Sequence, residues 1–168
     1  YQHLPGDDWD LDHLHERTLL TTRVDPDPVA VKWINPAIER GAEREVVVTV
    51  GEGGGIWLLD RATGEFLWAM PFPYDIPEFH VSDINVETGR TSLNWDSVFK
   101  QDGDRKIVCY HNTRSFWSTA YDPTRNALYI PFHDACLDMT ANASTPSGFG
   151  PRSGILRPGV SPDEYAAI

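Results

Sequence analysis

Hydrophobic and polar positions along the chain predict short β-strands joined by tight turns. The β-branched run Glu45–Val50 is followed by the glycine cluster Gly51–Gly55. Two apolar stretches, Ile56–Leu59 and Phe66–Trp68, then flank the turn Asp60–Gly64. Short apolar runs bounded by turn residues are typical of strands. We therefore predict three consecutive strands in this part of the chain.

Two later segments repeat this arrangement. Val81–Gly89 is a weaker copy of the strand and turn, and Thr119–Pro131 has the pattern strand, Asp-containing turn, strand. No long segment has helical periodicity; Pro162–Tyr165 is expected to form one turn, and residues 25–44 and 141–159 are expected to be irregular loops. Antiparallel units with a recurring Asp-x-x-Thr-Gly turn indicate a radial repeat of stacked small sheets. A β-sandwich also contains short strands of this kind.

Composition agrees with an all-β fold and excludes some partners. The 13 Gly, 13 Pro and 11% aromatic residues fit a turn-rich β protein. With 25 acidic and 14 basic residues the net charge is −11, which argues against binding to nucleic acid. No stretch approaches the roughly 18 apolar residues of a membrane helix. Because the chain opens on Tyr1 without an initiator Met, we expect one domain, residues 1–168, truncated at both ends.

The segment that carries the clearest chemistry is Trp9-Asp10-Leu11-Asp12. In an extended backbone, residues two apart point to the same face, so Asp10 and Asp12 can reach one ion. Hard cations take several oxygen ligands, more than one side chain supplies. The pair therefore predicts a cation site, and an acidic turn is the alternative interpretation.

Several motifs together resemble the eight-bladed pyrroloquinoline quinone (PQQ) alcohol dehydrogenases. Leu58–Trp68 is similar to their tryptophan-docking repeat, in which the Trp lies between neighbouring blades. Tyr1–Asp12 is similar to their active-site strand, and Ala120–Met139 and Arg157–Ile168 to later repeats. The resemblance covers nearly the whole chain. It implies a partial β-propeller, about three blades of the eight-bladed quinoprotein propeller.

The resemblance also implies roles for the acidic pair. Asp10 matches the general base, which takes the hydroxyl proton of a small primary alcohol while hydride passes to PQQ and an aldehyde forms. Asp10 and Asp12 match ligands of a calcium or lanthanide ion that acts as a Lewis acid. Lanthanide-type members carry an aspartate at the position of Asp12, which favours a lanthanide. A turn hydrogen bond is the alternative role for Asp12.

Other positions match the quinone-contacting part of the family less well. Ser115 and Phe116 match cofactor-contacting positions, and Trp117 is displaced by one residue. Glu52 stands where the family commonly has a Lys or Arg beside the quinone oxygens. Arg114 could supply that positive charge, or be a surface arginine.

Two cysteines complete the resemblance. Cys109 and Cys136 match positions that bridge adjacent strands, which implies a disulfide and a periplasmic location. Two buried thiols are the alternative. The family also implies a cytochrome c or other electron acceptor, and the remainder of the propeller, as partners.

Two rival functions remain at this point. Asp10-x-Asp12-His13-x-His15 contains ligand types of a metallohydrolase, but alternation places His13 on the face opposite the aspartates. A non-catalytic propeller scaffold is the other rival, since related repeats also build binding proteins. A scaffold has no need of Trp9-Asp10-x-Asp12, and that segment favours the enzyme.

Overall fold

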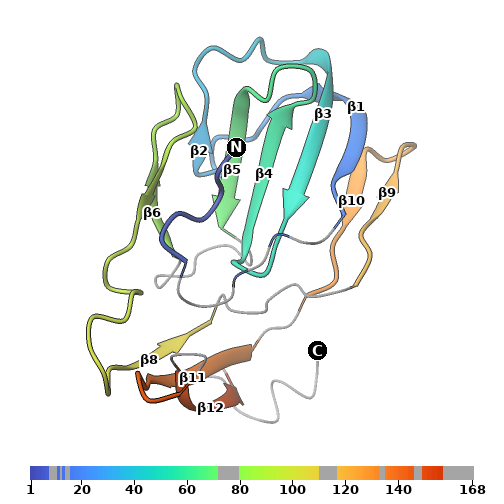
Figure 1. Cartoon of the computed structure of the whole chain (residues 1–168). Helices are drawn as coiled ribbons and strands as arrows, with labels where there is room; N and C mark the ends of the chain where they lie inside the picture. Colours follow the sequence, from blue (N-terminus) through green and yellow to red (C-terminus); the bar gives the residue numbers. More distant parts are fainter. Residues whose placement is uncertain are drawn as a thin grey trace.

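The computed structural model describes residues 1–7, 11, 13, 16–71, 80–109, 117–132, 135–145 and 149–156. Within these ranges the chain forms strands and turns and no helix, which confirms the all-β expectation (Figure 1). The strands are β1 (Thr18–Val24), β2 (Trp33–Ile34), β3 (Ala42–Val50), β4 (Gly55–Asp60), β5 (Phe66–Pro71), β6 (Val81–Ile84), β7 (Thr91–Leu93), β8 (Arg105–Val108), β9 (Ala120–Asp122), β10 (Ala127–Tyr129), β11 (Ala135–Ala141) and β12 (Phe149–Leu156).

The largest sheet is antiparallel and has the order β1-β3-β4-β5-β2. Its centre, β3 to β5, is the strand–turn–strand series predicted from the hydrophobic runs. In the ladder of β4 and β5, Leu58 pairs with Trp68 and Leu59 with Phe66, so Leu67 is an extra residue on β5. This bulge places Trp68 on the same face as Leu58, because side chains of paired residues share a face.

The two predicted loops each contain a strand that the sequence analysis missed. Residues 25–44 include β2, whose Trp33 pairs with Ala69, and the first residues of β3. Residues 141–159 include β12, which pairs with β11 along most of its length. Both segments are rich in turn residues. β2 is extended because it pairs with β5, further along the chain, and β12 because it forms a hairpin with the preceding strand β11. The predicted turn at Pro162–Tyr165 lies outside the described residues.

The main sheet is covered differently on its two faces. One face contributes Trp57 and Leu59 to a core shared with β6, β8 and β11 and with the N-terminal segment (residues 1–13), of which Leu4 and Leu11 take part. The opposite face contributes Val46 and Leu58 to a second core, against which Leu128 and Ile130 pack. A groove of about 280 Å³, lined by Trp68, Leu128 and Ile130 among others, separates part of this face from β9 and β10.

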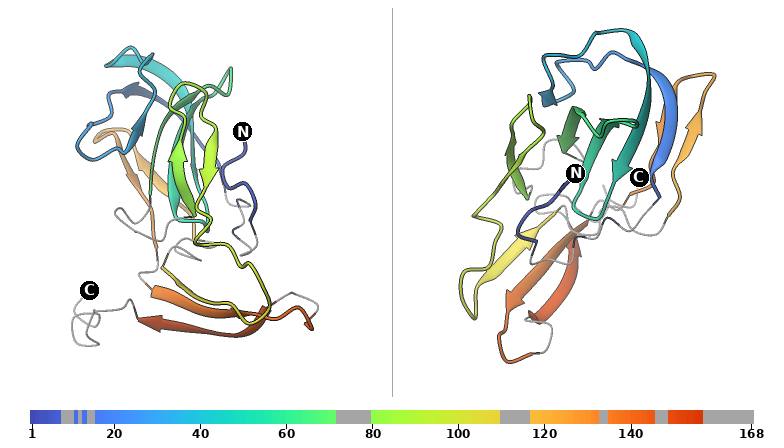
Figure 2. Two further views of the ribbon diagram at one scale, coloured as in Figure 1. Left: turned by 90° about the vertical axis from the view of Figure 1, so that its left-hand side faces the viewer. Right: turned by 45° about the horizontal axis from the view of Figure 1, so that its top comes forward.

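The smaller sheets surround the main one. The β6–β7 hairpin lies beside one face, β9 and β10 lie beside β1, and the sheet β8-β11-β12 lies below (Figures 1 and 2). Several small antiparallel sheets packed around one complete sheet agree with the expected partial propeller.

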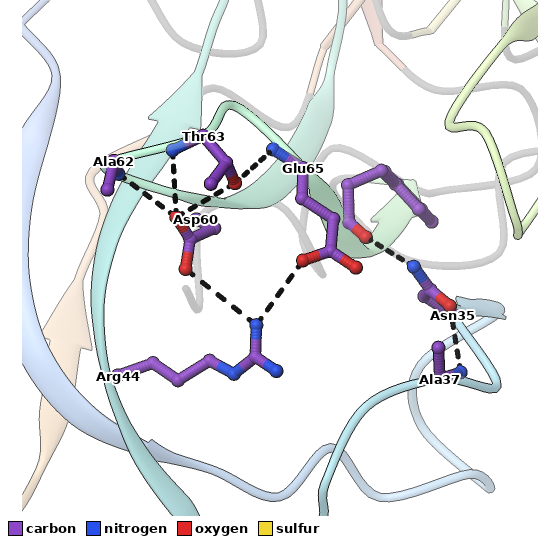
Figure 3. Close-up of polar contacts among 8 residues, drawn as sticks. Asn35, Ala37, Arg44, Asp60, Ala62, Thr63 and Glu65 are labelled. Atoms are coloured by element: carbon purple, nitrogen blue, oxygen red, sulfur yellow. Dashed lines mark hydrogen bonds and ion pairs between the residues drawn. The ribbon is translucent and has the colours of Figure 1, made fainter.

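Two of the hairpin turns are built alike. In the turn after β4, Asp60 Oδ1 accepts hydrogen bonds from the backbone N–H groups of Ala62 and Thr63, at 3.0 and 2.9 Å, and from the Thr63 hydroxyl (Figure 3). In the turn after β6, Asn85 Oδ1 accepts the corresponding three bonds, at 3.0–3.1 Å. Both turns end on a glycine with φ of 73°. The recurring turn predicted from sequence is therefore confirmed.

Candidate functional site

The structure describes some of the predicted site residues and not others. Asp10, Asp12, Ser115 and Phe116 lie outside the described residues, as do Trp9 and Arg114. Trp117 is described, and it lies just before β9 with 39% of its surface exposed. Glu52 is half-buried in the turn between β3 and β4. What the structure defines is the framework on either side of the acidic pair.

Two imidazole rings form the centre of this framework. The rings of His3 and His13 stack with their centroids 4.4 Å apart and their planes 12° apart. The edge-on ring of Trp57, which is fully buried, lies 5.1 Å from His3 and 5.6 Å from His13. One histidine precedes the acidic pair and the other follows it, so the stack joins the two ends of the segment that carries Asp10 and Asp12.

Polar contacts involve the His3 ring and the backbone of His13. His3 Nε2 lies 2.8 Å from the Thr49 hydroxyl on β3, a hydrogen bond. The Arg17 guanidinium donates a hydrogen bond to the backbone carbonyl of His13. Burial, together with repulsion from His13 and Arg17, lowers the pKa of His3 to about 3, so this ring is neutral at neutral pH.

Apolar contacts bury two leucines near these histidines. Leu4 and Leu11 belong to the core that contains Trp57, and Leu11 is only 2% exposed. The backbone N–H of Leu11 donates to Asp7 Oδ2 at 2.9 Å. Gly51 and Gly53 give the segment its space: an added Cβ would lie 2.6 Å from the His13 ring or 2.2 Å from Leu4, respectively.

The first residue of the segment contacts the second hairpin turn. The Tyr1 hydroxyl donates a hydrogen bond to the carbonyl of Gly89, and its ring stacks on Phe66 at 6.2 Å. Burial raises the pKa of the Tyr1 phenol, so the hydroxyl keeps its proton and acts as the donor.

A third histidine, His80, just before β6, contacts Pro5 in the same part of the chain. His80 is fully buried, and its Nε2 lies 3.2 Å from the carbonyl of Pro5. Its Nδ1 lies 3.2 Å from the Ser97 hydroxyl. The sequence analysis assigned no role to His3 or His80. Nothing in the local sequence marks them, because their partners are 46 and 75 residues away.

The predicted disulfide is present. Cys109 and Cys136 are bonded across a separation of 27 residues and join the end of β8 to β11. The Arg105 guanidinium binds both carboxylate oxygens of Asp138 on the same pair of strands, and this ion pair lowers the pKa of the Asp138 carboxyl. Among the described residues no three His, Cys, Asp or Glu side chains are grouped as a metal site. No helix of the described chain is long and apolar enough to cross a membrane.

The donor types in the acidic segment fit a hard cation. Two carboxylates supply oxygen ligands, which calcium and related ions prefer. Of the described residues around this pair, Leu11 lies in the core and the ring nitrogens of His13 are buried.

Comparison with known proteins finds similarity to alcohol and methanol dehydrogenases. Quinohemoprotein alcohol dehydrogenase ADH-IIG of Pseudomonas putida is 27% identical over 140 residues, 79% of this chain and 16% of that protein. A lanthanide-dependent methanol dehydrogenase of Methylacidiphilum fumariolicum (strain SolV) is 26% identical over 156 residues, 92% of this chain and 23% of that protein. No protein-family model matches the chain.

Solved structures show the same likeness in fold. The structure of ADH-IIG from Pseudomonas putida HK5 superposes with a TM-score of 0.67 at 24% identity, covering 87% of this chain and 19% of that one. A europium-containing methanol dehydrogenase gives 0.65 at 22% identity, covering 92% and 24%. The resemblance to the quinoprotein alcohol dehydrogenases is thus confirmed. The fold is a partial all-β propeller, and the chain spans about a fifth of the length of these quinoprotein alcohol dehydrogenases.

Proposed function

We propose that the chain is part of a PQQ-dependent dehydrogenase that oxidises a small primary alcohol to an aldehyde. The observation that carries this proposal is the likeness to quinohemoprotein and lanthanide-dependent alcohol dehydrogenases over most of the chain, combined with the segment Trp9-Asp10-x-Asp12. The half-buried stack of His3 and His13, one on each side of that segment in sequence, supports it, because a site of fixed geometry needs a rigid frame.

Within this proposal Asp10 has two tasks. Its carboxylate, ionised at neutral pH, accepts the hydroxyl proton of the alcohol and also binds the cation. Asp12 supplies a second anionic ligand and favours a trivalent ion, since an added carboxylate stabilises the higher charge. When bound, PQQ supplies the hydride acceptor and calcium or a lanthanide the Lewis acid.

The wider context follows from the same proposal. Ser115, Phe116 and Trp117 would lie beside the quinone, and the remaining contacts would come from the rest of the propeller. The Cys109–Cys136 disulfide supports an oxidising compartment, the periplasm. A cytochrome c or another electron acceptor would reoxidise the cofactor.

The test uses the full-length protein, reconstituted with PQQ and either calcium or a light lanthanide. Alcohol-dependent dye reduction is expected, and Asp10→Asn should abolish it. Asp12→Ala should change which metal supports turnover. Asp96→Asn is the matched control, because its side chain is 96% exposed in a different loop. Absence of PQQ binding with either metal would rule out the dehydrogenase and favour a scaffold.

A further inference from the structure

The loop between β1 and β3 has its two ends side by side. Val24 pairs with Ala42 across the two strands, and the Gly41 N–H donates a hydrogen bond to the Val24 carbonyl at 2.9 Å. Just beyond this pair, Arg40 and Asp25 form an ion pair at 2.7 Å. A two-residue turn would therefore be enough to connect the strands. Instead the chain passes to the opposite edge of the sheet, where β2 lies (Figure 1).

Residues 32–38 lie along the outer edge of β5, and we call them the strap. Trp33 pairs with Ala69 and Ile34 with Trp68, in antiparallel register. In the sheet order β1-β3-β4-β5-β2, the strap therefore occupies the edge of β5 that faces away from β4. The outer edge of β5 is thus paired within the molecule.

Asn35 extends this contact beyond the two paired residues. Its backbone N–H donates to the Leu67 carbonyl at 2.9 Å, and its side-chain amide donates to the Phe66 carbonyl at 2.8 Å (Figure 3). The Asn35 side-chain oxygen accepts the Ala37 N–H at 2.9 Å, which fixes the orientation of the amide. Because Asn35 is only 3% exposed, its amide replaces water as the donor to a buried carbonyl.

The strap also closes both cores at this edge. Neighbouring residues of a strand point to opposite faces. Accordingly Trp33, which is 4% exposed, joins the core on one face, and Ile34 packs against the core on the other. Ile38 belongs to this second core as well. The Trp33 Nε1–H donates to Asp83 Oδ1 on β6 at 2.9 Å. The strap is therefore held by the main sheet and by the β6–β7 hairpin.

The covered edge has the properties of a self-associating strand. The sequence of β5, Phe-Leu-Trp-Ala-Met-Pro, contains no charged residue. Exposed apolar edges without charges pair readily with strands of other molecules. A second copy of the chain always offers an identical edge, and two such edges can pair antiparallel about a twofold axis. A second copy is therefore the partner that an uncovered β5 fits.

The strap itself lacks these properties. Its ladder with β5 is two residues long. Pro36 follows Asn35 and has no N–H to donate, and Lys32 precedes the ladder with its ammonium 4.4 Å from the centre of the Trp33 ring. Short edge strands, proline and lysine all disfavour pairing between the edges of two sheets. The strap thus replaces an edge that pairs readily by one that pairs poorly.

We propose that the strap is an edge guard: it occupies the outer edge of β5 and prevents a second copy of the chain from pairing there. The contact is autoinhibitory, because it uses the same backbone groups of β5 that a partner strand would use. This role is independent of the dehydrogenase chemistry, since it involves the main sheet and β6 alone.

The experiment removes the strap from the full-length protein. Replacing residues 25–41 by the dipeptide Asn-Gly joins Val24 to Ala42 through a two-residue hairpin turn. Sedimentation velocity over a range of concentrations measures association, and hydrogen exchange measures the protection of the β5 amides. We expect the sedimenting mass to double as the concentration rises, while that of the unaltered protein stays constant. The β5 amides should exchange faster at low concentration and regain protection when the variant associates.

A point variant tests the same edge with the loop intact. Asn35→Ala removes the donor to the Phe66 carbonyl and should speed exchange of the β5 amides about tenfold, the factor expected for one lost buried hydrogen bond. It should also associate, though more weakly than the loop replacement. Val46→Ala is the matched control for lost stability, because Val46 is fully buried on β3, away from this edge. It should lower the melting temperature without causing association.

Several results would overturn the guard role. A folded loop-replacement variant that sediments like the unaltered protein would do so, as would association that leaves the β5 amides unprotected. Equal association of Val46→Ala would attribute the effect to lost stability. If the loop replacement does not fold, a folded Asn35→Ala protein with unchanged exchange at β5 overturns the role by itself. Alcohol oxidation is not a readout here, so none of these results bears on the proposed function.

Discussion

The turns Asp60–Gly64 and Asn85–Gly89 have the same hydrogen bonds and different surroundings. In both, one side-chain oxygen accepts three bonds from the next residues, and the glycine N–H bonds back to the carbonyl of the first residue, at 2.9 and 2.7 Å. An aspartate in one turn and an asparagine in the other give the same geometry. The acceptor oxygen, and not the charge, therefore determines this turn.

The surroundings distinguish the two glycines. A Cβ on Gly64 would meet no atom within 4 Å, whereas a Cβ on Gly89 would lie 2.5 Å from Phe66 Cβ and 2.7 Å from the Tyr1 ring. The first turn is a solvent-exposed connection. The second is part of the interface with the N-terminal segment, so the same local motif carries a tertiary role in only one of its copies.

The largest effect is expected from replacing these glycines. Both have φ of 73°, so Gly64→Ala should cost about 1–2 kcal/mol of unfolding free energy from backbone strain alone. Gly89→Ala should cost about 2–5 kcal/mol, because overpacking against Phe66 adds to the strain. Urea unfolding of the full-length protein measures both. Equal losses of unfolding free energy would show that the packing around Gly89 adds nothing to the cost of the substitution.

Removing the acceptor oxygens should affect the two turns alike. Asp60→Ala and Asn85→Ala each delete an acceptor of three hydrogen bonds in an exposed turn. Each should lower the unfolding free energy by about 1–2 kcal/mol. The same urea titration compares them. A difference larger than either loss would mean that the two turns are not equivalent.

The Tyr1 hydroxyl tests the link between the second turn and the N-terminal segment. Tyr1→Phe keeps the ring on Phe66 and removes the bond to the Gly89 carbonyl, at an expected cost of about 1 kcal/mol. Tyr121→Phe is the matched control, since its hydroxyl donates to Asn126 Oδ1 on the surface at 2.8 Å. The control should cost less, because water replaces an exposed bond readily. Thermal unfolding at neutral pH distinguishes the two variants.

The smallest expected effect on stability comes from the charge of the Asp60 carboxylate. Hydrogen bonds from the Thr63 backbone, with others in the turn and the Arg44 charge, lower the pKa of the Asp60 carboxyl. Its stabilising effect is therefore complete above the unfolded-state pKa, near 4, and is lost as the pH falls through the lower folded-state pKa. Asp60→Asn should lack this acid dependence and change stability little at pH 7. Asn85→Asp should acquire it.

These predictions are checked by unfolding measurements between about pH 2 and pH 7, below and above the carboxyl pKa of an unfolded chain. Arg44 lies 3.7 Å from Asp60 (Figure 3), and an exposed ion pair contributes only about 0–1 kcal/mol. An Asp60→Asn protein that retains the full acid dependence would assign that dependence to other carboxylates.

Several parts of the molecule could be predicted from the sequence because they depend on residues close together in the chain. The strands β3 to β5 follow from continuous apolar runs, and the turns follow from an acceptor and a glycine four residues later. The Cys109–Cys136 disulfide followed from the family resemblance, and the structure confirms it. The roles of Asp10 and Asp12, and of Ser115 and Phe116, stay predictions because they lie outside the described residues.

Other parts escaped the sequence analysis because their causes are distant. The segment that forms β2 is rich in turn residues, and it is extended because Trp33 pairs with Ala69 on β5. β12 was missed for another reason: its Gly and Pro residues resemble a loop, although it forms a hairpin with the preceding strand β11. Likewise, Asn35 looks like a loop residue but is 3% exposed, with its amide bonded to the Phe66 carbonyl (Figure 3).

By itself, the sequence determined the repeated hairpins, the all-β class and the acidic pair behind Trp9, because each depends on residues a few positions apart. Only the tertiary structure decided that His3 stacks on His13 and that the Tyr1 hydroxyl donates a hydrogen bond to the Gly89 carbonyl. These contacts join residues that are far apart in the chain. They form only when the sheet has brought both partners together, since packing free energy depends on position in space and not on sequence neighbours.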